Sequence, residues 1–270
     1  MNKVNFLLAG LLSAFLCANV SAQKLTVSVS SGYGMPMAAQ DYLRERTRDN
    51  TTDVVDMVKY SLGKGLNFNG SIGYNVKDNM ELELGVGYLM GGKTVSLERD
   101  LRDPANHITH TREISATMLS FSPGMVFKMA TEGLQPYVKV AAIIGVPAVH
   151  SDYTYEDNVD LIVVNRKYYK GAAVGFSSAF GVNYDLGSLK LFGELFANSL
   201  SYSPSYGEIT EYTTNGQDML STLDVKDMSV NLLTTLDRKT KIANTSPDES
   251  LKTYYPLSSV GLKVGIKMSF

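Results

Sequence analysis

The sequence predicts an all-β fold in which eight antiparallel strands close into a barrel, and three observations predict it. Apolar and polar residues alternate with a period of two through most of the chain. The polar positions are rich in glycine, serine and asparagine, which suits a narrow barrel interior; a soluble surface normally carries far more lysine and glutamate. Short and long connections alternate between the segments, as in transmembrane barrels with short periplasmic turns and long extracellular loops.

Residues 1–22 are interpreted as a signal peptide and residues 23–270 as the barrel domain. A basic start is followed by the apolar run Phe6–Leu16, which is too short to span a bilayer as a helix. The small residues Val20–Ala22 then predict cleavage before Gln23. The single cysteine of the sequence, Cys17, would leave with this segment. A lipoprotein is the alternative, but Leu16 stands where such sites have a small residue.

Eight alternating segments are recognised, and they cover residues 25–29, 66–76, 82–88, 119–129, 138–146, 172–184, 189–195 and 259–270. Three connections are short, at about 77–79, 130–135 and 187–188. Four are long, at about 36–63, 91–112, 149–168 and 203–254. An even number of strands would place both chain ends on the periplasmic side, with the short turns.

The last long connection leaves a ten-stranded barrel open as an alternative. Residues 206–213 and 228–236 alternate well enough to form two further strands. In the membrane they would direct Glu208 or Glu211 toward lipid and would need a long periplasmic connection, and both features are unfavourable. A hairpin outside the membrane is the preferred interpretation.

Tyrosine is frequent, with 16 residues, and tryptophan is absent. Six tyrosines near predicted strand ends are candidates for a girdle at the lipid headgroups, and they are Tyr74, Tyr88, Tyr137, Tyr184, Tyr202 and Tyr254. The general preference of strands for tyrosine is the alternative explanation.

Six charged residues are predicted to face the barrel interior, and they are Glu83, Lys128, Lys139, Glu194, Lys263 and Lys267. Charges in a narrow lumen must pair or stay hydrated, because isolated burial is costly. We expect these lumen charge pairs to fill the interior and fix strand register. A gate that opens when the pairs rearrange is the alternative.

No segment predicts a catalytic, metal or cofactor site, and we expect the protein not to be an enzyme. His107 and His110 are three residues apart without a carboxylate or cysteine nearby, which makes a poor metal site. His150, Ser151 and Asp152 have the residue types of a hydrolase triad, but adjacent residues of a strand cannot bring their functional atoms together. The carboxylates of the third long connection lack EF-hand spacing and are expected to be solvated, and they are Asp152, Glu156, Asp157 and Asp160.

The last segment resembles the terminal strand of outer-membrane barrels, which carries alternating apolar residues and ends in an aromatic one. The matching positions are Leu262, Val264, Ile266, Met268 and Phe270. The resemblance implies that these residues form the signal read by the barrel-assembly machinery. Residues 24–270 resemble the small OmpA-like and OmpX-like eight-stranded barrels, with OmpW-like barrels as a near relative. The chain differs in its longer fourth loop and in lacking a peptidoglycan-binding domain after the barrel.

Together these features predict an outer-membrane protein with a structural and surface-interaction role, in envelope integrity or adhesion. The alternatives are a narrow passive channel for small or apolar solutes and, further off, a hydrolase that modifies lipid A. The expected partners are outer-membrane lipid and lipopolysaccharide, the barrel-assembly machinery during insertion, and an extracellular ligand of the loops. The net charge of −2 argues against nucleic acid as a partner.

Overall fold

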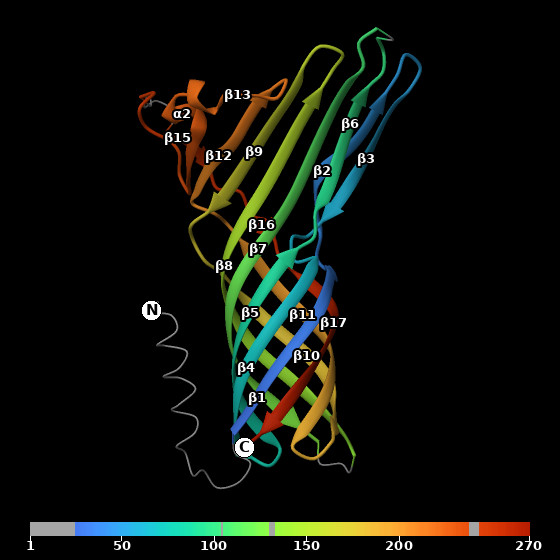
Figure 1. The fold of residues 1–270 in the computed structure, drawn as a ribbon, viewed down its shortest axis with the longest axis vertical. Coiled ribbons are helices and arrows are strands. Elements are labelled where there is room, and N and C mark those ends of the chain that lie inside the picture. Colours follow the sequence, from blue (N-terminus) through green and yellow to red (C-terminus); the bar gives the residue numbers. More distant parts are fainter. Residues whose placement is uncertain (1–24, 104, 130–132, 238–242) are drawn as a thin grey trace.

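The computed structural model describes residues 25–103, 105–129, 133–237 and 243–270. The predicted signal peptide, residues 1–22, lies outside these residues. Strands make up nearly all of the regular structure (Figure 1). Among the described residues, no helix has the length and apolar character needed to cross a membrane.

Eight of the described strands close into a barrel, which confirms the predicted fold class. They are β1 (Leu25–Pro36), β4 (Gly65–Lys77), β5 (Met80–Gly91), β7 (Ile108–Lys128), β8 (Leu134–Glu156), β10 (Ala173–Asp185), β11 (Leu189–Tyr202) and β17 (Ser259–Ser269). Each strand pairs antiparallel with the next, and β17 returns to pair with β1. Closure leaves no unpaired strand edge in the barrel wall, as a hydrocarbon environment requires.

The long connections form a second β-structure instead of the loops that were predicted. Their strands are β2 (Gln40–Arg48), β3 (Asp53–Tyr60), β6 (Thr94–Asp100), β9 (Leu161–Tyr169), β12 (Tyr206–Thr214), β14 (Ser229–Leu233) and β15 (Asp248–Leu251). With the outer parts of β7 and β8 they pair in the order β3-β2-β6-β7-β8-β9-β12-β14-β15. This outer sheet continues the barrel beyond one end (Figure 1).

The loop prediction failed because β7 and β8 are far longer than the membrane-spanning segments that were recognised. They pair from Thr109 opposite Glu156 down to Lys128 opposite Tyr137, so their hydrogen bonds continue past the barrel mouth. This extension gives β6 and β9 edges on which to pair. Smaller pieces complete the region, namely β13 (Gln217–Asp218), the 3-10 turn η1 (Leu220–Thr222), α2 (Val225–Met228) and β16 (Tyr255–Pro256).

The ten-stranded alternative is wrong. β12 and β14 pair with each other, and β12 also pairs with β9, all within the outer sheet. Glu208 lies opposite Lys167 of β9 in this pairing, away from the barrel wall. The hairpin outside the membrane is the arrangement that forms.

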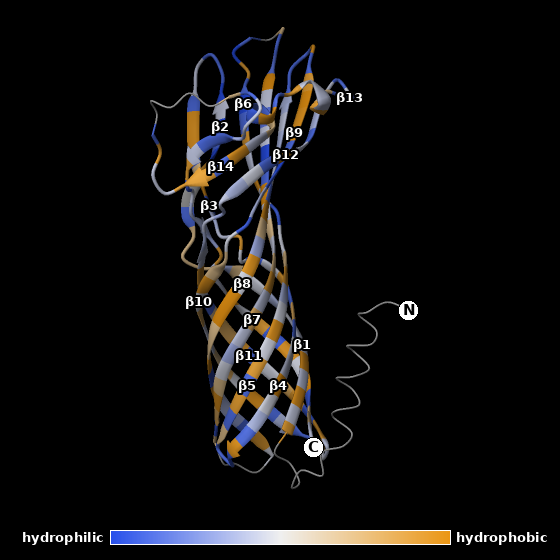
Figure 2. Cartoon of the chain, turned by 90° about the vertical axis from the view of Figure 1, so that its left-hand side faces the viewer, coloured by the Kyte–Doolittle hydropathy of each residue, from blue (hydrophilic) through white to orange (hydrophobic). Residues whose placement is uncertain are grey.

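The apolar faces of the barrel strands point outward, as the alternation predicted. Val29 and Val264 are 60% and 67% exposed, whereas their neighbours on the polar faces, such as Ser28 and Ser30, are buried. Bands of apolar residues alternate along the barrel strands (Figure 2). Exposed apolar and buried polar side chains are the inverse of a soluble protein, and they suit a wall facing acyl chains.

The short turns, the start of β1 and the C-terminus lie together at the end opposite the outer sheet (Figure 1). Leu25 and Phe270 exchange backbone hydrogen bonds, with Phe270 N–H donating to Leu25 O at 2.8 Å. Gly187 makes the β10–β11 turn at a φ of +94°, a conformation that glycine adopts without strain. The short turns are the predicted periplasmic ones.

The tyrosine girdle prediction is wrong for two residues. Tyr137 and Tyr202 are 4% and 1% exposed, because their positions in β8 and β11 point into the barrel. Tyr74, Tyr88 and Tyr184 remain on the outward face and are exposed. The sixth residue, Tyr254, is exposed in the segment that precedes β16.

Candidate functional site

The six charges predicted for the lumen lie inside the barrel, and each pairs with another inward charge. They are Glu83, Lys128, Lys139, Glu194, Lys263 and Lys267. Glu83 pairs with Lys139, and Glu194 Oε2 lies 3.2 Å from Lys263 Nζ. Lys128 and Lys267 instead share a carboxylate that the prediction left out.

That carboxylate is Glu81, which is fully buried. Its Oε2 lies 2.5 Å from Lys128 Nζ and its Oε1 lies 3.1 Å from Lys267 Nζ. Thr26 Oγ1 also donates a hydrogen bond to Oε1 at 2.6 Å. Glu81 stands two residues before Glu83 on the same alternating face, so strand periodicity was the signal that could have found it.

Glycines make room for the larger members of this interior network. A Cβ at position 73 would overlap the Glu81 carboxylate, and a Cβ at position 181 would overlap the ring of Tyr137. Tyr137 donates a hydrogen bond to Glu194 Oε1 at 2.9 Å. The charges therefore hold several strands in one register, since removing one partner of a buried pair costs several kcal/mol.

An apolar plug closes the outer mouth of the barrel. Two chain segments far apart in the sequence fold over the opening, one carrying Tyr60 and Leu62 and the other carrying Tyr255 and Leu257. The segments are tied by the Leu62 N–H, which donates to Pro256 O at 2.8 Å, and by Ser61 Oγ, which donates to Ser258 O at 2.6 Å. We call these four apolar residues, with the inward side chains that they cover, the outer plug. The covered side chains include Leu89, Met118, Ile143 and Leu200.

A small cavity remains between the outer plug and the charge network. It measures about 70 Å³ and is lined by serine, asparagine and glycine residues, by apolar side chains and by members of the charge pairs. A cavity of this size holds a few water molecules. The described residues thus fill the lumen and leave it without a wide passage.

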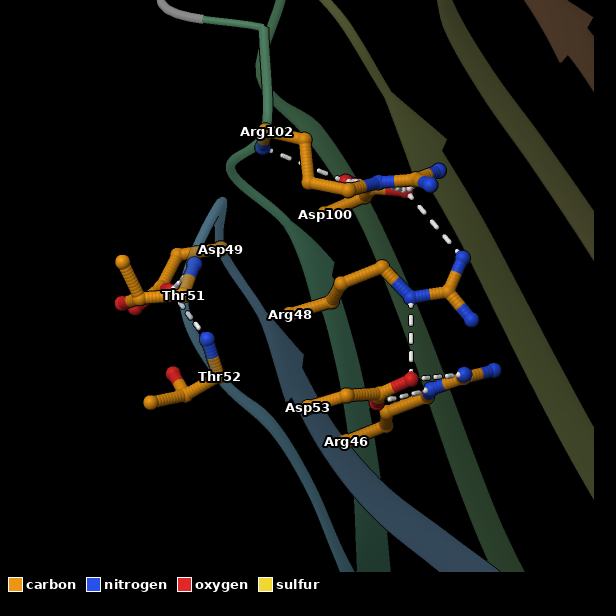
Figure 3. Close-up of polar contacts among 8 residues, drawn as sticks. All are labelled: Arg46, Arg48, Asp49, Thr51, Thr52, Asp53, Asp100 and Arg102. Carbon is orange, nitrogen blue, oxygen red and sulfur yellow. Dashed lines mark hydrogen bonds and ion pairs between the residues drawn. The ribbon is translucent and has the colours of Figure 1, made fainter.

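The outer sheet carries a ladder of arginine and aspartate side chains across β3, β2 and β6 (Figure 3). Asp53 Oδ2 lies 2.5 Å from Arg46 Nη2 and 3.2 Å from Arg48 Nε. Arg48 also lies 3.8 Å from Asp100, which pairs with Arg102 at 2.6 Å. The hydrogen bond from Arg102 lowers the pKa of Asp100. Single exposed pairs contribute little, but a connected set orders the β2–β3 hairpin against β6.

The turn of that hairpin is held by Asp49. Its Oδ1 accepts hydrogen bonds from the backbone N–H groups of Thr51 and Thr52, at 2.7 and 2.6 Å (Figure 3). These bonds hold the pKa of the Asp49 carboxyl well below its usual range. The Asp49 carboxylate therefore stabilises the β2–β3 turn by accepting these hydrogen bonds.

The residues considered for hydrolase chemistry do not form a triad. His150, Ser151 and Asp152 are consecutive in β8, where they lie opposite Ser115, Ile114 and Glu113 of β7. Successive residues of a strand point to opposite faces, so Ser151 is directed away from the other two.

The candidate metal residues have other contacts. His110 Nδ1 lies 2.7 Å from the Tyr153 hydroxyl. Asp157 accepts hydrogen bonds from the Val159 and Asp160 amides in the β8–β9 turn. No group of three or more ligating side chains is found within the described ranges.

The terminal strand presents its alternating apolar residues outward. Leu262, Val264, Ile266, Met268 and Phe270 are all exposed on the barrel wall or at its end. Their place at the last strand, which closes the barrel onto β1 and β11, is compatible with the predicted assembly signal.

A closed antiparallel barrel with an apolar outer wall and a filled polar interior defines the class of outer-membrane β-barrel proteins. The chain belongs to the outer membrane protein beta-barrel domain family, whose sequence model matches residues 7–233. The protein is accordingly located in the outer membrane. No curated protein matches the chain significantly.

Several solved structures are similar to the chain at low sequence identity. Neisserial surface protein A is 10% identical, with coverage of 93% of this chain and 99% of that one and a TM-score of 0.40. Ail, the attachment invasion locus protein of Yersinia pestis, is 8% identical, with coverage of 91% and 98% and a TM-score of 0.30. CarO2 of Acinetobacter baumannii is 14% identical, with coverage of 92% and 100% and a TM-score of 0.35.

Proposed function

We propose that the protein is a sealed membrane anchor that displays the outer sheet at the cell surface, with a structural and surface-interaction role. The outer plug is the observation that carries this proposal. Tyr60, Leu62 and Leu257 are almost completely buried over the mouth of the barrel, and ion pairs fill the interior below them. Such an interior favours anchoring over transport.

The size of the outer sheet supports the surface part of the proposal. It contains nine strands of the described chain, counting the outer parts of β7 and β8. Envelope stability alone would require little structure beyond the membrane. A hydrogen-bonded sheet instead offers a fixed arrangement of side chains to a partner, and ordered scaffolds position binding residues better than flexible loops.

The channel alternative is tested by planar-bilayer conductance of the refolded protein. We expect the wild-type protein to be silent, because the outer plug and the charge network both lie in the path of a solute. The double variant Leu62→Gly and Leu257→Gly removes apolar volume from the plug. Its conductance is the matched control, because it shows what a leak through the barrel looks like. Steady conductance steps from the wild-type protein would contradict the proposal.

The surface role is tested in a strain that lacks the protein. We expect its loss to reduce attachment of cells to surfaces or their resistance to detergent, and the full chain to restore both. A chain in which residues 40–58 are replaced by a glycine-serine linker retains the barrel strands and the four apolar residues of the outer plug but loses β2 and most of β3. We expect it to restore detergent resistance and not attachment. A strain whose attachment and detergent resistance are both unchanged would contradict the role.

A further inference from the structure

A polar hollow lies on the outer sheet beside the arginine ladder. Its volume is about 410 Å³, and it is lined by Leu43 and Arg44 of β2, Ser96 and Glu98 of β6, His110 and Arg112 of β7, and Tyr153 of β8. The volume is within the range of small-molecule sites, roughly 300–1,000 Å³. The hollow shares no residue with the ladder of Figure 3, and of its lining residues Leu43 belongs to the buried cluster that contains the outer plug.

Strand register explains why these side chains meet. Ser96 lies directly opposite Arg112, and Arg112 lies directly opposite Tyr153. Glu98 lies opposite His110, two residues further along β6 and β7 from the Ser96–Arg112 pair. Residues directly opposite each other on neighbouring strands share a face of the sheet, and so do residues two positions apart on one strand. The side chains from β2, β6, β7 and β8 therefore lie on one surface.

The aromatic side chains of the hollow, His110 and Tyr153, are held in place by contacts with each other and with Arg112. His110 Nδ1 is within hydrogen-bond distance of the Tyr153 hydroxyl, at 2.7 Å, and the two rings are stacked with centroids 6.0 Å apart. The Arg112 guanidinium lies 5.9 Å from the centroid of the Tyr153 ring. Ser96 is buried and donates its hydroxyl hydrogen bond to the Arg44 carbonyl, which ties β6 to β2.

The charges of the hollow are unpaired, in contrast to those of the ladder. Arg46, Arg48 and Arg102 all pair with aspartates. Arg44 and Arg112 have no ion pair with any residue of the described chain, and both are exposed. Two arginines without ion-pair partners line the hollow, and they match an anionic group, since arginine binds carboxylates through paired hydrogen bonds.

Building on the proposed surface role, we propose that this hollow binds an acidic sugar that carries a carboxylate. Arg44 and Arg112 bind the carboxylate, Glu98 accepts hydrogen bonds from ring hydroxyls, and the Tyr153 ring packs on the apolar face of the sugar. Glu98 disfavours a compact phosphate, because the charge of such an ion is spread over all its oxygens and lies close to the Glu98 carboxylate, whereas a sugar can place neutral hydroxyl groups there and keep its carboxylate at the arginines. The ligand needs a carboxylate and hydroxyl groups together.

Two sources supply such sugars, namely the inner core of lipopolysaccharide and the sialylated glycans of animal cells. The experiment is isothermal titration of the refolded full chain in detergent with three probes. These are the methyl glycoside of 3-deoxy-octulosonic acid, 3′-sialyllactose and lactose. We expect one or both acidic probes to bind and lactose to fail, and the acidic probe that binds identifies the source.

Arg112→Gln and Arg44→Gln should each weaken binding by roughly tenfold or more, as loss of a charge-assisted hydrogen-bond pair predicts. Arg99→Gln is the matched control. Arg99 lies next to Glu98 on β6 but points to the opposite face, so its loss should change binding less than twofold. Heat-modified gel migration verifies that every variant retains the barrel.

The assignment would be overturned if neither acidic probe binds or if lactose binds as tightly as the acidic probes. It would also be overturned if Arg99→Gln weakens binding as much as Arg112→Gln does. Inorganic phosphate that binds as tightly as the sugars would overturn it as well. The conductance and attachment results stand independently, so the sugar site can fail while the proposed function holds.

Discussion

Glu81 is the residue on which the periplasmic half of the interior charge network converges. It binds Lys128 and Lys267 and accepts the Thr26 hydroxyl hydrogen bond. The other inward charges could be predicted from strand alternation alone, because their faces follow from the apolar residues beside them. Their pairing could not be predicted, because it depends on the register between strands that lie up to 186 positions apart in the sequence.

Replacement of Glu81 by glutamine should destabilise the barrel by about 3 kcal/mol, because it leaves the buried Lys128 ammonium without a counter-charge and Lys267 with only the Glu83 carboxylate, at 4.0 Å. Urea unfolding in lipid vesicles, followed by gel migration, measures the loss. Asp185→Asn is the matched control, since it removes the exposed pair with Lys190 at 3.2 Å and should cost less than about 1 kcal/mol. Equal stability of Glu81→Gln and wild type would show that the network is not structural.

Gly73→Ala tests the packing around the same carboxylate. The added Cβ would overlap Glu81 and Thr26, so the barrel should lose roughly 1–3 kcal/mol, the range for overpacked interiors. Gly193→Ala adds the same methyl group where no atom lies within 4 Å, and it should be close to neutral. The midpoint of heat-modified migration compares the two variants, and the same midpoint for both would argue against the close packing.

At the scale of the elements, the barrel strands were predictable and the outer sheet was not. Alternation identified every membrane strand, since one face must meet lipid and the other must meet a crowded interior. Residues outside the membrane are under no such constraint. The outer parts of β7 and β8, from Ile108 to Arg112 and from Val149 to Glu156, mix polar and apolar residues and fall within the predicted long connections. Only the pairing of these extensions shows that they are strands.

The terminal strand carries a prediction that belongs to this scale. Deletion of Phe270 should lower the amount of protein inserted in the outer membrane several-fold, because the resemblance makes this residue part of the assembly signal. Phe270→Tyr keeps an aromatic end and should insert normally. Quantitative blotting of the folded, faster-migrating form measures both. Normal insertion of the truncated chain would refute the signal.

At the scale of the whole molecule, the two ends of the barrel differ in chemistry. One end carries short turns, the start of β1 and the end of β17, and the other carries the outer plug and the outer sheet. The plug was not predictable, because Leu62 and Leu257 are brought together by the closed barrel and not by any local pattern. The hollow was also missed, since Arg44, Arg112 and Tyr153 come from three different connections.

The most direct test of this account is the labelling of single cysteines on intact cells with a membrane-impermeant maleimide. The sequence has one cysteine, Cys17, within the predicted signal peptide, so introduced thiols can be read individually. Asn50→Cys, in the β2–β3 turn, and Glu156→Cys, at the outer end of β8, should label on intact cells. Asp78→Cys and Ser188→Cys, in the short turns, should label only after the outer membrane is permeabilised. Labelling of the short turns on intact cells, or protection of the outer turns, would contradict a barrel that displays its outer sheet at the cell surface.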